Sequence, residues 1–194
     1  KKYHLLTMID EAHATGVIGK TGHGTLEHFG STCKPDILMG TLSKALGSEG
    51  GYACASKVII DYLKNKARSF IFATSQAPAA LAAALRAIEV LEEEPQRAQS
   101  LQHNVDFFLD ALHAEGVEAY SPTAIIPVII GDEATALQVA NELLANGVLA
   151  PAIRYPTVAK GTARLRIALM ATHTEAELIK TAKLIGAAIR KYKK

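Results

Sequence analysis

The chain has 194 residues, 49% of them hydrophobic, and its 21 Lys and Arg residues nearly balance 19 Asp and Glu residues. This composition excludes a disordered segment, which would be poor in apolar residues and strongly charged. A nucleic-acid-binding surface is not expected without a basic stripe, and a membrane span would need about 18 or more uninterrupted apolar residues. Two cysteines, Cys33 and Cys54, are too few for a disulfide framework, so a cytoplasmic protein is expected.

The first part of the chain combines short apolar runs with glycine-rich segments. The runs predict buried strands at residues 5–9, 36–40 and 51–55, the last two as neighbours. Asp10 and Glu11 follow the first strand directly. The glycines in residues 16–30 predict a long loop, and a second polar segment, 41–50, separates the later strands. Loops of this length usually carry function.

The rest of the chain has the spacing of helices and short strands. Helices are predicted at residues 58–66, 78–94, 95–113, 133–146 and 174–192. Strands are predicted at residues 117–120, 124–130, 147–153 and 163–169. Thr174 with Glu177 is typical of a capping box at a helix start. We therefore divide the chain near residue 97 into a strand-and-loop part and a compact α+β unit.

One motif pair suggests a nucleotide hydrolase. Residues 10–13 spell the acidic motif of a helicase family, and residues 19–21 match the end of a phosphate-binding loop. A full loop, G-x-x-x-x-G-K-S/T, requires glycine where this chain has Ala14, with a helix after it. The acidic motif also comes before the phosphate loop instead of after it. The sequence therefore disfavours an NTPase.

A metal site is the second alternative. The candidate ligands are His13, His23, His28 and Cys33, whose spacings match no common zinc pattern. No metal is predicted.

A different set of side chains matches the requirements of pyridoxal phosphate (PLP) chemistry. Asp10 stands at a predicted strand end with His13 three residues on, which suits a carboxylate at a ring nitrogen with an imidazole beside it. Thr41 and Ser43 supply hydroxyls for a phosphate, and Lys44 is an amine able to form an imine. These are the protein groups that PLP enzymes use.

Three motifs in register carry a resemblance to a known family. They are residues 8–19 (MIDEAHATGVIG), residues 40–47 (GTLSKALG), and residues 152–158 (AIRYPTV) with 161–166 (GTARLR). The chain resembles the C-terminal half of the α-oxoamine synthases, which are fold-type-I PLP enzymes. This resemblance implies an α/β fold. Residues 1–97 would be the C-terminal portion of the PLP-binding large domain, and residues 98–194 a small C-terminal α+β domain.

The resemblance also implies roles for the residues around the cofactor. Lys44 would bind PLP covalently, Asp10 would pair with the pyridine nitrogen, and His13 would bond the phenolic oxygen. Thr41 would hold the phosphate.

Further roles concern the substrate and a second subunit. Arg154 would bind the amino-acid carboxylate, and Thr157 would lie near the substrate. Because members of this family are homodimers with the site at the interface, Thr74 and Ser75 would reach the phosphate of the other subunit. Arg164 and Arg166 alternate with apolar residues in a predicted strand, which favours a structural role.

The implied activity is that of an acyltransferase. An amino acid would condense with an acyl-CoA, with loss of carbon dioxide and CoA. Residues 153–158 with 161–164 most resemble the members that join L-alanine to pimeloyl-CoA in biotin synthesis, and glycine C-acetyltransferase is the alternative. Since full-length members are about twice as long, the 194-residue chain is expected to be inactive alone. A binding or dimerisation domain that keeps the motifs as remnants is a third possibility.

Overall fold

The structure is a computed structural model that describes residue 3 and residues 5–192. The chain divides between Gln99 and Ser100 into two compact units, which are described one at a time. Within the described residues, no helix combines the length and apolar character needed to cross a membrane.

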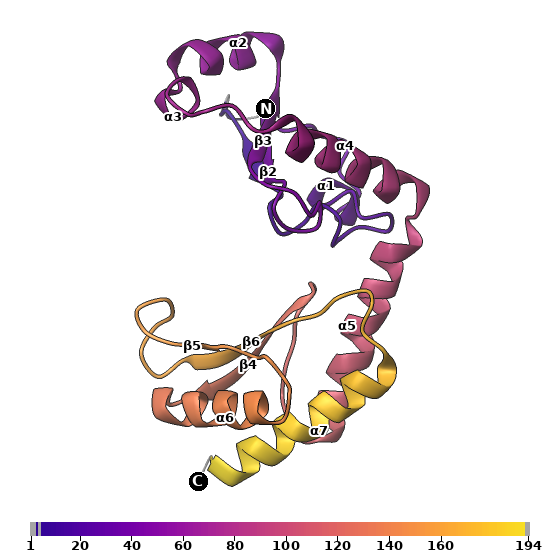
Figure 1. The fold of residues 1–194 in the computed structure, drawn as a ribbon, viewed down its shortest axis with the longest axis vertical. Coiled ribbons are helices and arrows are strands. Elements are labelled where there is room, and N and C mark those ends of the chain that lie inside the picture. Colours follow the sequence, from indigo (N-terminus) through magenta and orange to yellow (C-terminus); the bar gives the residue numbers. More distant parts are fainter. Residues whose placement is uncertain (1–2, 4, 193–194) are drawn as a thin grey trace. The chain divides into compact units, whose positions relative to one another are not determined.

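A three-stranded sheet forms the centre of the first unit (Figure 1). Its strands, in the order β1-β2-β3, are β1 (Met8–Asp10), β2 (Ile37–Thr41) and β3 (Gly51–Ala55). β1 runs parallel to β2, with Asp10 opposite Met39, and β2 pairs antiparallel with β3, with Gly40 opposite Tyr52. The predicted pairing of the two later strands is therefore confirmed.

The helices of this unit are partly those that the sequence predicts. They are α1 (Thr25–His28), α2 (Lys57–Lys66), α3 (Arg68–Ile71) and α4 (Pro78–Glu93), and α5 (Gln96–Ala114) begins here. The predictions for α2, α4 and α5 are confirmed to within two residues. α1 and α3 were not predicted, because four residues are too few to show a helical period.

The predicted burial of these strands is wrong. β3 is exposed or half-buried along its length, and the first strand begins only at Met8, after the exposed Leu5 and Leu6. An apolar run predicts a buried strand, but a strand is buried on both faces only where another layer packs on each face of its sheet. The described residues of this unit do not provide both layers.

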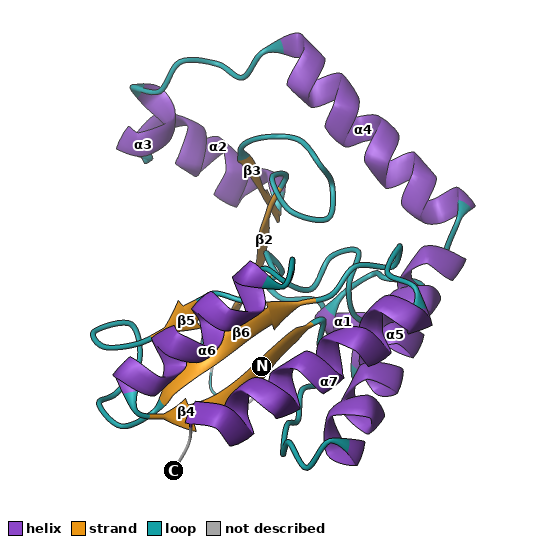
Figure 2. Cartoon of the chain, turned by 60° about the horizontal axis from the view of Figure 1, so that its bottom comes forward, coloured by secondary structure: helices purple, strands orange, loops and turns teal. Residues whose placement is uncertain are grey.

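The second unit is an antiparallel sheet covered by helices (Figure 2). It contains β4 (Ile125–Gly131), α6 (Glu133–Ala145), β5 (Ala152–Ile153), β6 (Ala163–Ala168) and α7 (Glu175–Tyr192), with strand order β4-β6-β5. α6 packs on all three strands and beside α7. Alternate residues of β4 and β6 are buried, as expected for a sheet with one covered face. The largest fully buried side chains include Phe108, Leu112, Ile126, Leu143, Leu165 and Ile185.

Two predicted strands are helix ends instead. The prediction for residues 117–120 is wrong, and that for 147–153 holds only for Ala152 and Ile153. The amide of Val117 donates to the carbonyl of Leu112, as in a Schellman motif at the end of α5.

The end of α6 repeats this arrangement. The amide of Val148 donates to the carbonyl of Leu143, and the glycine before each valine, Gly116 or Gly147, has a positive φ. A glycine and an apolar residue after a helix are the signature of this motif. The apolar valines therefore close helices, although they look like strand residues in the sequence.

Candidate functional site

Asp10 and Thr41 lie at the same edge of the first unit's sheet. Each is the last residue of its strand, and β1 and β2 are parallel, so both strands deliver their carboxyl ends to this edge. Asp10 is exposed and Thr41 is half-buried. Ligands of α/β proteins usually bind at the carboxyl ends of parallel strands.

Lys44 lies in the lysine loop, which we define as residues 42–50. Leu42 and Leu46, four residues apart, are 7% and 4% exposed and pack on Ala84 of α4. Two hydrogen bonds close the loop, from the Leu42 amide to the Gly50 carbonyl (2.9 Å) and from the Ser48 amide to the Leu42 carbonyl (2.8 Å). The two leucines thus pack the loop against α4, whereas Lys44, which lies between them in the sequence, is exposed.

The hydroxyl of Thr41 is engaged at the base of this loop. It donates to the Gly50 carbonyl at 3.0 Å and lies 2.8 Å from the hydroxyl of Ser43. The Ser43 amide also donates to Thr41 Oγ1 (3.2 Å). Thr41 and Ser43 thus form one hydrogen-bonded group of two hydroxyls and an amide, and the exposed Lys44 is the next residue along the chain.

The segment after Asp10 touches the lysine loop. A Cβ built on Gly16, which has a φ of +76°, would lie 2.7 Å from the Cβ of Ala45. Tyr52 of β3 makes a second link, since its hydroxyl lies 3.1 Å from Thr15 Oγ1. The structure therefore brings the segment that carries Asp10 and His13 against the loop that carries Lys44.

His13 occupies the turn that follows β1. The turn begins with a hydrogen bond from the Ala12 amide to Asp10 Oδ1 (2.8 Å). The amide of Ala14 then donates to the Glu11 carbonyl (2.9 Å). His13 is exposed between these two contacts.

Thr74 and Ser75 lie in the exposed connection between α3 and α4. Their neighbour Gln76 donates from Nε2 to the carbonyl of Glu49 (2.7 Å). Gly50, with a φ of +90°, has no room for a Cβ against this amide group. Gln76 therefore ties the Thr74–Ser75 segment to the end of the lysine loop.

Arg154 and Thr157 belong to the second unit. Arg154 directly follows β5, and its carbonyl accepts a hydrogen bond from the Thr157 amide (3.0 Å). The turn between them contains a cis peptide bond from Tyr155 to Pro156. Both residues are exposed, and they lie on the same turn.

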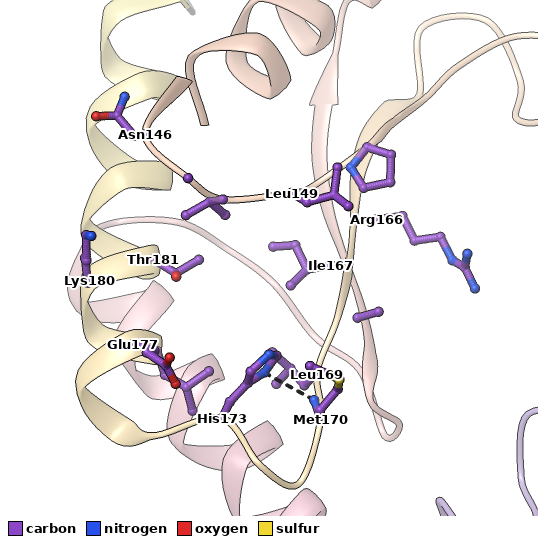
Figure 3. A pocket seen from close by; sticks show the side chains of 15 residues that line it. Asn146, Leu149, Arg166, Ile167, Leu169, Met170, His173, Glu177, Lys180 and Thr181 are labelled. Carbon is purple, nitrogen blue, oxygen red and sulfur yellow. Dashed lines mark hydrogen bonds between the residues drawn. The ribbon is translucent and has the colours of Figure 1, made fainter. Parts of the chain in front are cut away.

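The second unit also contains a surface cavity of about 620 Å³ between β6 and α7 (Figure 3). Its lining is mainly apolar, and His173 Nδ1 at one end accepts a hydrogen bond from the Met170 amide (3.2 Å). Neither Arg154 nor Thr157 lines it, although Arg166 does. The cavity is separate from the turn that presents Arg154.

The segment resembling a phosphate loop does not have the geometry of one. In a phosphate loop the backbone amides point at the ligand, but the Thr21 amide and hydroxyl donate to the Glu27 carboxylate. Burial pushes the pKa of Glu27 upward, and hydrogen bonds from Thr21 and His23 outweigh it and hold this pKa below its ordinary value of 4.5. The position that a phosphate would take is filled by the chain's own carboxylate. Among the described residues, no group of three or more His, Cys, Asp or Glu side chains is arranged to hold a metal.

Sequence reasoning did not identify three residues that shape this site. Glu11 is 2% exposed, Tyr52 covers Gly40, and Gln76 holds the lysine loop. Tyr52 had a detectable signal, because an aromatic residue opposite a strand glycine commonly covers it. Glu11 and Gln76 had none, since their partners are distant in sequence.

Comparisons with known proteins show the family to which the chain belongs. The family described as aminotransferase class I and II matches residues 1–185. The chain is 49% identical over 179 residues to 8-amino-7-oxononanoate synthase 1 of Bacillus subtilis, covering 92% of this chain and 46% of that protein. It is 43% identical over 185 residues to 8-amino-7-oxononanoate synthase of Treponema denticola, covering 95% and 47%. The chain thus spans about half the length of the curated relatives it matches.

Solved structures give the same result for the fold. Serine palmitoyltransferase from S. paucimobilis with bound PLP–myriocin aldimine superposes with a TM-score of 0.90 at 27% identity, over 99% of this chain and 49% of that one. 8-Amino-7-oxononanoate synthase from Francisella tularensis gives a TM-score of 0.83 at 29% identity, over 95% and 55%. The α/β fold and the resemblance inferred from the three motifs are confirmed, and the chain belongs to the aminotransferase class I and II family.

Proposed function

We propose that this chain provides the lysine-bearing half of a PLP-dependent α-oxoamine synthase. The observation that carries the proposal is the contact between the segment after Asp10 and the lysine loop at the carboxyl edge of β1 and β2. A carboxylate, an imidazole, two hydroxyls and an amine are thereby gathered on neighbouring loops. The names of the curated relatives support the same activity.

The groups present fit PLP by their chemistry. Asp10 would pair with the pyridine nitrogen and His13 with the ring oxygen. Thr41, already ordered by Ser43 and Gly50, would bind the phosphate, and Lys44 would hold the cofactor covalently. Asp10 and Lys44 are both exposed, so their charged groups are accessible to the cofactor.

The bound cofactor would supply a conjugated ring that accepts the electron pair of a broken Cα–H bond. Asp10 would keep a negative charge at the ring nitrogen. Lys44, displaced by the amino acid, would take the proton from Cα through Nζ. Leu42 and Leu46 pack the loop against α4, so the exposed amine of Lys44 would be able to move while the loop backbone keeps its place.

We further propose L-alanine and pimeloyl-CoA as substrates, with 8-amino-7-oxononanoate as the product. The guanidinium of Arg154 suits the amino-acid carboxylate, because its planar donors match both oxygens. Thr157, on the same turn, would contact the substrate. Glycine C-acetyltransferase remains the second candidate, because Tyr155–Pro156 and residues 125–128 resemble that enzyme equally well.

The proposal assigns residues 1–97 to the large domain and residues 98–194 to the small domain of such an enzyme. It also includes a homodimer in which Thr74 and Ser75 reach the partner's cofactor phosphate. Their exposure and their connection to the lysine loop through Gln76 support this role.

The test uses the intact protein loaded with PLP. Borohydride reduction should fix the cofactor to Lys44, identified by peptide mass spectrometry, and Lys44→Ala should abolish both this adduct and the visible absorption of the bound cofactor. Lys20→Ala, which changes an exposed lysine outside the site, serves as the control. Labelling at a residue other than Lys44 would refute the assignment.

Turnover separates the candidate substrates and functions. Alanine with pimeloyl-CoA should release CoA and give the product mass of 8-amino-7-oxononanoate, whereas glycine with acetyl-CoA as the only active pair would establish the alternative. The 194-residue chain alone should show no turnover, since it spans about half the length of its relatives. If the intact protein binds no PLP, the binding or dimerisation domain is the correct interpretation.

A further inference from the structure

Glu11 is a buried carboxylate that the proposed chemistry does not use. It is 2% exposed and directly follows Asp10. Its side chain accepts hydrogen bonds from the Thr25 amide (2.9 Å to Oε2) and from the Thr25 hydroxyl (3.0 Å). A buried carboxylate is stable only when such donors replace its water.

The backbone of Glu11 is held equally firmly. Its amide donates to the Met39 carbonyl of β2 (2.7 Å), and its own carbonyl accepts from the amides of Ala14 (2.9 Å) and Thr15 (3.0 Å). These bonds form the turn in which His13 lies. Glu11 therefore connects the end of β1, the His13 turn and the start of α1.

Gly24 shows how closely this contact is packed. Its φ is +89°, and a Cβ at this position would overlap Glu11 Oε2. The chain thus needs glycine beside the carboxylate, for conformation and for space.

We propose that Glu11 is a positioning residue that fixes the orientation of Asp10 and His13 toward the cofactor. This inference rests on the proposed function. With Thr25 as its anchor, Glu11 closes the 14-residue span between the two positions and prevents the His13 turn from relaxing. Misplacing a group in an active site by about 1 Å can cost about 100-fold in rate.

Glu27 provides a matched control. It is a second glutamate of the same segment, and it also accepts three donors, the Thr21 amide and hydroxyl and the His23 amide. It is not adjacent to Asp10. Removal of Glu27 should loosen the segment without disturbing the residues that we assign to the cofactor.

The experiment compares Glu11→Ala, Glu11→Gln and Glu27→Ala in the intact, PLP-loaded protein. The measurements are kcat, the PLP dissociation constant, and the pH midpoint of the visible absorption of the bound cofactor. Glu11→Ala should lower kcat about tenfold or more and shift the midpoint, since Asp10 and His13 set the charge around the ring. Glu11→Gln should remain close to wild type, because its amide oxygen still accepts from Thr25. Glu27→Ala should lower the melting temperature alone.

Hydrogen exchange without PLP separates this inference from the proposed function. The amides of Ala14, Thr15 and Thr25 should exchange faster in Glu11→Ala, and Thr25→Val repeats the effect in a milder form if the alanine variant does not fold. An unchanged pH midpoint and kcat in a folded Glu11→Ala protein would overturn the positioning role. Equal damage from Glu11→Gln and Glu11→Ala would also overturn it. If the wild type binds no PLP, the proposed function fails, and unchanged exchange in the variants would refute the positioning of the turn.

Discussion

Gly40 and Tyr52 face each other across β2 and β3, and a Cβ on Gly40 would lie 2.5 Å from the Tyr52 hydroxyl oxygen. The ring of Tyr52 therefore occupies the space that a side chain at residue 40 would need. From there its hydroxyl reaches Thr15 Oγ1. One missing side chain in β2 thus lets β3 contact the segment that carries His13.

Replacement of Gly40 should show how much stability depends on the space that this glycine leaves for Tyr52. Gly40→Ala should lower the free energy of unfolding by about 1–3 kcal/mol, because the added methyl group forces the ring aside. Urea denaturation measures the loss. Combining Gly40→Ala with Tyr52→Ala should cost less than the sum of the two single changes, whereas a strictly additive result would contradict the contact.

Glu27 should make stability depend on acid pH. Its pKa is below the ordinary 4.5 in the folded chain, so the folded state holds its charged form more strongly than the unfolded state does. The stabilisation is complete above pH 4.5 and is lost as the pH falls through the lowered folded value. The difference in urea midpoint between wild type and Glu27→Gln should therefore shrink on acidification below pH 4.5. If the difference in urea midpoint grew on acidification instead, the pKa of Glu27 would be raised, not lowered, in the folded chain.

Arg154 should govern amino-acid binding if the proposed function is correct. Arg154→Lys keeps the positive charge but loses the paired donors, so the KM for the amino acid should rise about tenfold. The KM for the acyl-CoA should change little. Arg166→Lys, an exposed arginine of β6 in the same unit, is the matched control, and an equal effect there would indicate a general charge effect.

Asn104 should be important for the stability of the second unit. It is 5% exposed and donates from Nδ2 to the carbonyls of Met170 (3.0 Å) and His173 (2.9 Å). Asn104→Ala removes the donor for both carbonyls and should cost about 1–3 kcal/mol in urea unfolding. Gln102→Ala, on the same helix with an exposed bond to Asp106, should change stability much less. If both variants lost a similar free energy of unfolding, the claim that the buried hydrogen bonds of Asn104 matter more than the exposed one would be wrong.

Much of the second unit was predictable from the sequence. Its helices and two of its strands have clear periodicity. The capping box is confirmed, since the Thr174 amide donates to the Glu177 carboxylate (2.8 Å) and the Glu177 amide donates to the Thr174 hydroxyl oxygen (3.3 Å). These features depend on neighbours within a few residues. Val117 and Val148 were misread because an apolar residue after glycine suits both a strand and a helix end.

The sequence by itself determined the fold class, through the three motifs that carry the family resemblance. It also determined the candidate residues Asp10, His13 and Lys44 and their place at a strand end and in loops, because residue type and local spacing encode these properties. Only the tertiary structure decided how the loops are held. Three contacts hold them, and each joins residues that are 14 to 29 positions apart in the sequence. They are the hydrogen bonds of Glu11 with Thr25, the close contact of Gly16 with Ala45, and the hydrogen bond from Gln76 to Glu49. Such contacts depend on where the chain brings distant segments together. No local pattern in the sequence records that information.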